Sequence, residues 1–130
     1  MKRMFLAECH NLTDAAVLAV AERLPGLTHI DLTSFGRIDA ITSSAVETLA
    51  SKCRELDYIR LSDCPNVSDA ALMKIAEHCS KLRELHVYET AVTAAVLAKL
   101  AIKCSKLKTV WVDDDFIDSL SQIFPHVDWR

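Results

Sequence analysis

Apolar residues recur along the chain in a short LxxLxL frame that appears five times. The frames begin at Met1, Leu27, Leu56, Leu82 and Leu107, so successive frames lie 26, 29, 26 and 25 residues apart. Apolar residues at alternate positions over a short run predict a β-strand. A repeat of roughly 20–29 residues built on this frame is typical of leucine-rich repeats. We therefore expect five parallel strands stacked side by side.

An alanine-rich apolar segment separates each frame from the next. Its apolar residues recur at spacings of three and four, as in Leu72, Ile75, Ala76 and Cys79, which predicts a helix with one apolar face. A hydroxyl side chain precedes each segment and can accept from a free first-turn N–H. These residues are Thr13, Thr42, Ser68 and Thr93. The pattern predicts an α/β, right-handed leucine-rich repeat solenoid with parallel strands on its concave face and helices on its convex face.

The repeat changes at three places. The second unit is longer by three residues, and we expect Gly36 to Ala40 to form an extra turn at one rim. After the fifth frame we predict a short helix and a closing strand, with Phe124, Val127 and Trp129 in the frame positions. Solenoids need polar end caps, so missing sequence or another chain is expected to cover the N-terminal edge. Residues 1–130 are assigned to one domain of five repeats and a partial closing unit.

Composition limits the partners that the chain can have. A hydrophobic content of 51% in 130 residues is ample for a folded core, and the formal net charge is −3. This charge gives no broad cationic field, so nucleic acid is not an expected partner. The longest apolar run, Ala15 to Ala21, is too short for a membrane span of about 20 residues. We expect no membrane insertion.

The five cysteines follow the repeat and do not form a framework of pairs. Cys53, Cys79 and Cys104 each stand three residues before a frame, while Cys9 and Cys64 each stand three after one. Thiols in such places are simplest as small buried hydrophobic groups. Reduced cysteines indicate an intracellular compartment, cytoplasmic or nuclear.

The third unit, LDYIRLSDCPNVSDAALMKIAEHCSKL from Leu56 to Leu82, carries a more specific pattern. It combines LxxLxLxxC, ending at Cys64, with a helix that closes on Cys79. It resembles the cysteine-containing leucine-rich repeat of F-box/leucine-rich-repeat proteins. Other units depart from it at Leu24, Phe35 and Thr90, where cysteine would stand. The resemblance implies protein recognition, often as the substrate-selecting arm of a ubiquitin ligase; no helical segment precedes the first frame, so an F-box would have to lie outside this chain.

Side chains alternate along a strand, so residues beside the frame leucines should line the concave face. This predicts Arg3, Phe5 and Ala7; His29, Asp31 and Thr33; Tyr58, Arg60 and Ser62; Glu84, His86 and Tyr88; and Thr109, Trp111 and Asp113. Aromatic residues and arginine are enriched at interface hot spots. We therefore predict a protein-binding surface. Its residues are Phe5, Asp31, Tyr58, Arg60, His86, Tyr88 and Trp111.

Catalytic, metal and cofactor chemistry are not indicated. Ser62, His86 and Asp31 include the residue types of a nucleophilic triad, but a flat strand surface offers no water-excluding pocket. The Cys9–His10 and His78–Cys79 pairs lack the spacing of structural zinc ligands. The run from Asp113 to Asp115 lacks the glycine turn and distal glutamate of a calcium loop. With two glycines the chain has no phosphate loop.

We therefore expect a non-catalytic protein–protein interaction scaffold that binds a partner protein of unknown identity, with no metal and no cofactor. Two alternatives remain. One is a constitutive assembly subunit that uses its uncapped N-terminal edge inside a larger complex. The other is the substrate-recognition part of an F-box type ubiquitin ligase receptor.

Overall fold

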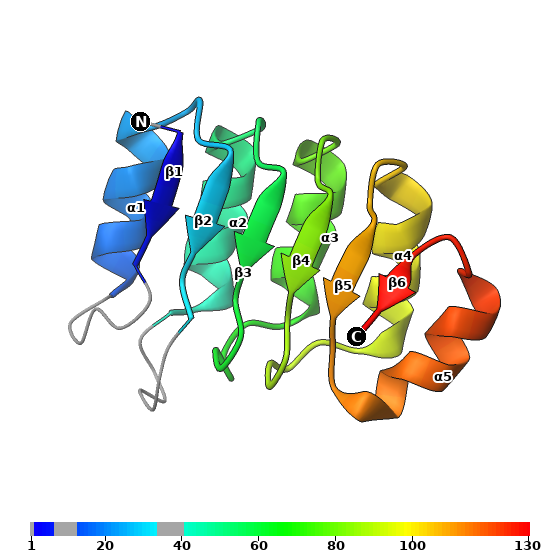
Figure 1. Cartoon of the computed structure of the whole chain (residues 1–130). Coiled ribbons are helices and arrows are strands. Elements are labelled where there is room, and N and C mark those ends of the chain that lie inside the picture. Colours follow the sequence, from blue (N-terminus) through cyan, green and yellow to red (C-terminus); the bar gives the residue numbers. More distant parts are fainter. Residues whose placement is uncertain (1, 7–12, 34–40) are drawn as a thin grey trace.

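The structure is a computed structural model that describes residues 2–6, 13–33 and 41–130. Within these residues, short strands alternate with ten-residue helices from one end of the chain to the other (Figure 1). In chain order the elements are β1 (Arg3–Phe5), α1 (Asp14–Arg23), β2 (His29–Asp31), α2 (Ser43–Lys52), β3 (Tyr58–Arg60), α3 (Asp69–His78), β4 (Glu84–His86), α4 (Ala94–Lys103), β5 (Thr109–Trp111), α5 (Asp114–Ile123) and β6 (Asp128–Trp129). The repeated β-α units expected from the sequence are confirmed.

The strands form one parallel six-stranded sheet in the order β1-β2-β3-β4-β5-β6. Its register aligns the middle apolar residue of every frame. From β1 to β6 these aligned residues are Met4, Ile30, Ile59, Leu85, Val110 and Trp129. The predicted alignment of the five frames is therefore confirmed. One repeat of the sequence leads from one strand to the next, across a spacing of about 4.8 Å.

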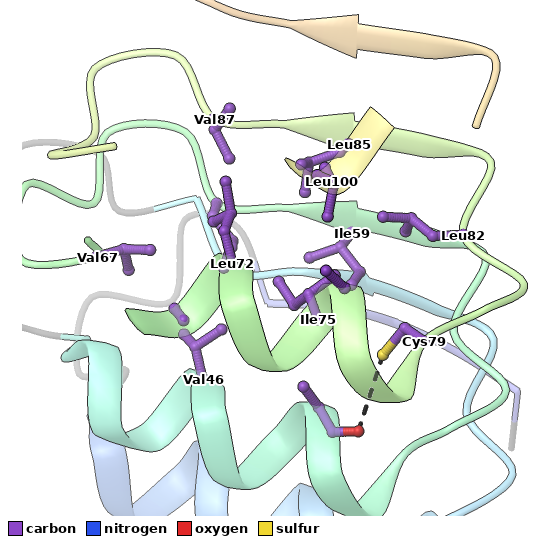
Figure 2. Close-up of a cluster of buried hydrophobic side chains, with 14 of the residues drawn as sticks. Val46, Ile59, Val67, Leu72, Ile75, Cys79, Leu82, Leu85, Val87 and Leu100 are labelled. Carbon is purple, nitrogen blue, oxygen red and sulfur yellow. Dashed lines mark hydrogen bonds between the residues drawn. The ribbon is translucent and has the colours of Figure 1, made fainter. Parts of the chain in front are cut away.

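Helices α1 to α4 lie in a row behind the sheet, and α5 lies at its β6 end (Figure 1). Between helices and sheet, Leu72 and Ile75 of α3 pack among strand residues such as Ile59 and Leu85 (Figure 2). These four side chains are almost fully buried. The apolar face predicted for the third helix therefore points at the sheet, and the frame residues point back at it.

No helix among the described residues is long and apolar enough to cross a membrane. The ten-residue length is set at both ends by the repeat. Each helix begins one residue after a polar N-cap and ends at a buried or half-buried C-cap. The C-caps are Leu24, Cys53, Cys79, Cys104 and Phe124.

Hydroxyl residues stand at the predicted helix starts, but most do not cap their own helix. Only Thr42 among the four accepts a bond from its own first turn, Ala45 N–H at 3.4 Å. Thr42 also donates its hydroxyl and its N–H to the Asp14 carboxylate of the preceding helix, at 2.6 and 2.9 Å. Hydrogen bonds to a charged carboxylate are stronger than those between neutral groups. The N-cap residue therefore links its own helix to the helix of the neighbouring unit.

The same link recurs along the helix row. The hydroxyl and N–H of Thr93 donate to Asp69 at 2.6 and 2.8 Å. Between these two links, the Ser68 N–H donates to the Ser43 hydroxyl at 3.1 Å. In each case the first helical residue of one unit bonds the N-cap of the next. This column of caps holds successive helices in register.

Buried thiols form a second column at the helix ends. The thiols of Cys53, Cys79 and Cys104 donate to carbonyl oxygens of the preceding unit at 3.3, 3.8 and 3.9 Å; Figure 2 shows the bond of Cys79. Burial raises the pKa of Cys79 to about 12 and that of Cys104 to about 11. These three cysteines form no disulfide. The prediction that they act as small buried groups is confirmed for them, whereas Cys9 lies outside the described residues.

The frame predicted for the last unit is wrong: Phe124, Val127 and Trp129 each lie one place earlier in the repeat than expected. Phe124 is the C-cap of α5, the place that Cys104 takes in α4. Trp129 pairs with Val110 and so occupies the middle position of the frame, not its end. The interval from Val127 to Trp129 is one residue shorter than the interval between the first two apolar residues of the other frames. A prediction based on the LxxLxL spacing therefore misaligned the last unit. The predicted turn at Gly36 to Ala40 lies outside the described residues.

Candidate functional site

The open face is the side of the sheet opposite α1 to α4, and it carries the first and third residue of each strand. Its third-residue row runs through Phe5, Asp31, Arg60, His86 and Trp111, which are aligned strand by strand. The predicted row is therefore confirmed in its register. Parallel pairing places each of these residues next to its neighbours at strand spacing.

Four rings form a continuous ladder across the open face. His29 and Tyr58 stack with ring centroids 5.6 Å apart and 18° between planes, and Tyr58 meets His86 at 5.4 Å. His86 and Trp111 stack at 5.4 Å and 15°. We call His29, Tyr58, His86 and Trp111 the aromatic ladder. It crosses β2, β3, β4 and β5.

Arg130 extends this ladder at the β6 end. Its guanidinium carbon lies 5.5 Å from the centre of the Trp111 ring, the geometry of a cation–π contact. Sequence reasoning missed Arg130 because the predicted frame placed Trp129 one position too late. Because Trp129 aligns with Val110, the next residue, Arg130, aligns with Trp111. The shortened last frame was the sequence signal that could have identified Arg130. His29 was predicted on the face but not as a binding residue.

Hydrogen bonding holds the centre of the ladder in place. The Nε2 of His86 lies 2.7 Å from Oε1 of Glu84 on the same strand. Burial lowers the pKa of His86, against the opposing effect of the Glu84 carboxylate. The imidazole is then neutral at pH 7, with Nε2–H donating to Glu84 and fixing the tautomer. His86 therefore contributes a flat, uncharged ring to the face.

Tyr58 keeps its proton for a different reason. Burial and the nearby Asp31 charge raise the pKa of Tyr58. Its phenol is therefore a neutral group that can both donate and accept a hydrogen bond. The ladder thus combines ring surface with a polar handle, the combination common at interface hot spots.

Three residues expected on the open face are buried. Asp31 is only 5% exposed, and Thr33 and Ser62 are buried as well. The Asp31 carboxylate accepts the Thr33 N–H at 3.0 Å and lies 3.7 Å from Arg60. Strands of three residues end before Thr33 and Ser62, so simple alternation does not extend to them. Asp31 thus keeps its place in the third-residue row but is covered, and its carboxylate lies beside the Arg60 guanidinium.

The remaining predicted residues are accessible but scattered. Phe5 is 60% exposed on the edge strand β1, four strands and about 19 Å from Trp111. Tyr88 is 46% exposed in the turn after β4 and makes no ring contact among the described residues. Arg60 is partly exposed beside Asp31. The structure thus brings Tyr58, His86 and Trp111 into contact, and Tyr88 lies in the turn beyond β4.

The open-face residues that include the types of a nucleophilic triad make separate contacts. His86 bonds Glu84 while Asp31 bonds Thr33 and pairs with Arg60, so their contacts do not link them to Ser62 as a triad. In the described ranges, no group of three His, Cys, Asp or Glu side chains is placed to hold a metal ion. A hollow of about 330 Å³ lies where the strands begin, bordered by His29, Tyr58 and Glu84.

Comparison with models of known protein families and with curated proteins finds no match for this chain. The resemblance to cysteine-containing leucine-rich repeats therefore rests on the residues themselves. Those residues include the strand frame from Leu56 to Leu61 and the buried cap Cys79. Both take corresponding places in successive units of the structure.

Proposed function

We propose that the chain is a non-catalytic protein-binding scaffold with the architecture of a right-handed leucine-rich repeat solenoid. The open face is then its concave surface and the helix row its convex surface. The observation that carries the proposal is the aromatic ladder: a line of four rings in contact, two stacked pairs joined by a tilted one and ended by Arg130, on the face opposite the helices. A partner protein is expected to dock over Trp111 and His86.

The ladder has the physical properties of a docking surface. Trp111 is 38% exposed although its ring packs on His86 and Arg130. Stacking fixes these side chains before a partner arrives, so binding costs less conformational entropy than it would for free rings. Tryptophan, tyrosine and arginine are also the residues that most often dominate binding energy. Together these properties favour recognition of a protein surface.

The ladder is too small to be a complete stable interface. A standard interface uses roughly 20–30 residues on each side, whereas the ladder and Arg130 supply five. The partly exposed Arg60 lies beside His86 in the third-residue row, and the exposed ring of Tyr88 lies in the turn that follows β4. We infer that the partner extends over these residues, with the ladder as the centre of the contact.

Replacement of Trp111 by alanine tests this proposal. The exposed Ile102 on α4, which is 71% exposed on the helix side, offers a matched control in Ile102→Ala. In proximity crosslinking from the cell of origin, the native chain and Ile102→Ala should yield the same crosslinked proteins. Trp111→Ala should lose them while its circular dichroism spectrum stays native, because an exposed ring adds little to the core.

The opposite pattern contradicts the proposal. If Trp111→Ala retains every crosslinked protein and Ile102→Ala loses them, binding belongs to the helix side. Purified partner then allows a direct measurement of the dissociation constant. Loss of a centrally placed tryptophan should weaken binding by about 2 kcal/mol or more, the cost typical of a hot spot.

An assembly subunit is the second candidate, and the β1 end of the fold favours it. Phe5 and Leu18 are exposed there, and Met4, Val20 and Leu24 are only partly buried. The residues of the third unit that correspond to Met4, Val20 and Leu24 are Ile59, Ile75 and Cys79, and these are almost fully buried. Hydrophobic residues at an open solenoid end are normally covered.

This candidate differs from the first in the state of the isolated chain. It predicts that the purified chain self-associates or unfolds at micromolar concentration, because its partner is part of its stability. Sedimentation velocity and thermal unfolding measure this. A folded monomer would contradict it and leave the free scaffold.

We also propose an intracellular location, cytoplasmic or nuclear. Cys53, Cys79 and Cys104 are buried thiols that bond carbonyl groups in place of forming disulfides. Such thiols suit a reducing compartment. Fluorescence microscopy of a tagged chain tests the location, and an extracellular signal would contradict it.

A further inference from the structure

A groove of about 670 Å³ runs along the edge of the sheet at which the strands begin, the upper edge in Figure 1. The turns that lead from each helix into the next strand form its walls. Its charged residues are Glu55, Asp57, Lys81, Arg83, Lys106 and Lys108. The groove adjoins the aromatic ladder, since Asp57 pairs with His29, but none of its lining residues belongs to the ladder. A ligand in the groove therefore need not contact the ladder rings.

The charge of this groove is opposite to that of the chain. Four cations and two carboxylates line it, a local charge of +2 on a chain of net charge −3. Lys81 pairs with Glu55, and Asp57 pairs with His29 at 3.4 Å. The other three cations make no ion pair among the described residues. These are Arg83, Lys106 and Lys108.

The repeat places these unpaired cations side by side. Arg83 and Lys108 are corresponding residues of successive units, and the Lys108 N–H donates to the Arg83 carbonyl at 2.8 Å. Their stems therefore leave the backbone about one strand spacing, 4.8 Å, apart. Like charges at this distance repel each other. Lys106 stands two residues from Lys108 and adds a third positive charge to the same wall.

We propose that this groove binds an acidic polypeptide segment. An anionic ligand would relieve the repulsion among Arg83, Lys106 and Lys108. An extended peptide advances about 3.3 Å per residue, so carboxylates on alternate residues lie about 6.6 Å apart on one face. The long, flexible side chains of Arg83 and Lys108 can reach such a pair from backbones about 4.8 Å apart. The carboxylates of Glu55 and Asp57 can meet backbone N–H groups or a lysine of the same segment.

The lining favours a peptide over a nucleic acid. Single-stranded nucleic acids are held by many cations together with rings on which bases stack. Among the lining residues, His126 is the one ring, and two carboxylates would face a continuous phosphate backbone. The negative charge of the whole chain adds to that repulsion. Carboxylates spaced along a peptide avoid it.

A charge-reversal pair tests the groove directly. Lys106→Glu with Lys108→Glu removes two exposed cations from its wall; Lys52→Glu with Lys99→Glu makes the same change of net charge on exposed helix positions. The probe is a short fluorescent peptide of alternating glutamate and glycine, read by anisotropy. Its counterpart carries glutamine for glutamate, and a single-stranded oligonucleotide of equal charge is the third probe.

We expect the native chain and the control pair to bind the glutamate peptide and not the glutamine peptide. The groove pair should weaken that binding at least about tenfold, and the neutral pair Lys106→Gln with Lys108→Gln should weaken it less. Raising the salt from about 0.1 M to about 1 M, which shortens the Debye length from about 10 to about 3 Å, should abolish it.

Three results would overturn the proposal. The first is no binding of the glutamate peptide by the native chain at low salt. The second is an equal loss in the groove and control pairs, which would reflect net charge alone. The third is tighter binding of the oligonucleotide than of the peptide. The Trp111→Ala variant should keep its affinity for the peptide, so failure here is distinct from failure of the ladder proposal.

Discussion

In the turn after β3 and again in the turn after β4, one residue has a backbone conformation that non-glycine residues rarely adopt. Asp63 and Glu89 have φ values of 60° and 54°. The Asp63 N–H donates to the Tyr88 carbonyl at 2.9 Å, and the Glu89 N–H donates to the Asp113 carboxylate at 3.0 Å. These bonds between successive turns offset the backbone strain. They also bring the carboxylates of three units close together.

This proximity makes Glu89 sensitive to pH. Its hydrogen bond to Asp63 and the charges of Asp63 and Asp113 raise the pKa of Glu89 above its ordinary 4.5. A raised pKa means that the folded state holds the proton more tightly than the unfolded state. The contribution to stability is therefore present below pH 4.5 and is lost as the pH rises through the folded-state pKa.

Glu89→Gln should stabilise the chain at pH 7. Glutamine has nearly the same shape as glutamate and the same backbone strain at this positive φ, but it removes the charge that Asp63 and Asp113 repel. The melting temperature should exceed that of the native chain at pH 7, and the difference should disappear near pH 3, where the native carboxyl is protonated. Glu22→Gln on α1 is the control. An equal melting temperature at pH 7 would show that solvent screens this cluster completely.

At the scale of elements, the cap column explains how helices of neighbouring units stay aligned. The sequence predicted the cap positions but not their partners. A hydroxyl before a helix indicates where the helix begins, whereas the acceptor for that hydroxyl is supplied by the preceding unit. The acceptors Asp14 and Asp69 lie in the first turns of α1 and α3, where an acidic side chain also complements the helix dipole. Their bonds to Thr42 and Thr93 required the packing of adjacent helices.

Asp69→Ala should therefore cost more than the loss of one surface charge. The variant leaves the N–H and hydroxyl of Thr93 without their shared acceptor. Asp115→Ala is the matched control, since Asp115 also lies in a first helical turn, that of α5, but makes no such bond among the described residues. Asp69→Ala should lower the free energy of unfolding by about 1–2 kcal/mol more than the control.

Urea denaturation followed by circular dichroism measures both variants. Asp69→Asn is an informative third variant, because its amide oxygen can still accept one of the two bonds. Its loss should lie between those of alanine and the native residue. If Asp69→Ala and Asp115→Ala cost the same, the inter-unit bonds add nothing beyond the helix dipole.

At the scale of the whole molecule, the fold was far easier to predict than the site. The frame leucines repeat because every unit must fill the same space, so periodicity alone gave the strands and their register. The open face obeys no such constraint. The buried Asp31 accepts the Thr33 N–H, and Arg130 reaches Trp111 through a shortened last frame. Neither contact follows from a repeating pattern.

The repeat also sets how stability is distributed. In a stack of units, each unit contacts only its neighbours, so central positions have support on both sides and terminal positions on one. Leu85 of β4 and Met4 of β1 occupy the same register position. Leu85 is fully buried between β3 and β5, whereas Met4 on the edge strand is only partly buried.

Alanine at these two positions should therefore have unequal effects. Leu85→Ala leaves a cavity between two packed neighbours and should cost about 2–5 kcal/mol in the free energy of unfolding. Met4→Ala should cost less than half as much, because part of its side chain already contacts water. Denaturant unfolding measures both values, and hydrogen exchange should show faster opening at β1 than at β4 in the native chain. Equal losses would mean that β1 is covered as completely as the central strands, and the assembly candidate would then lose the exposed edge on which it depends.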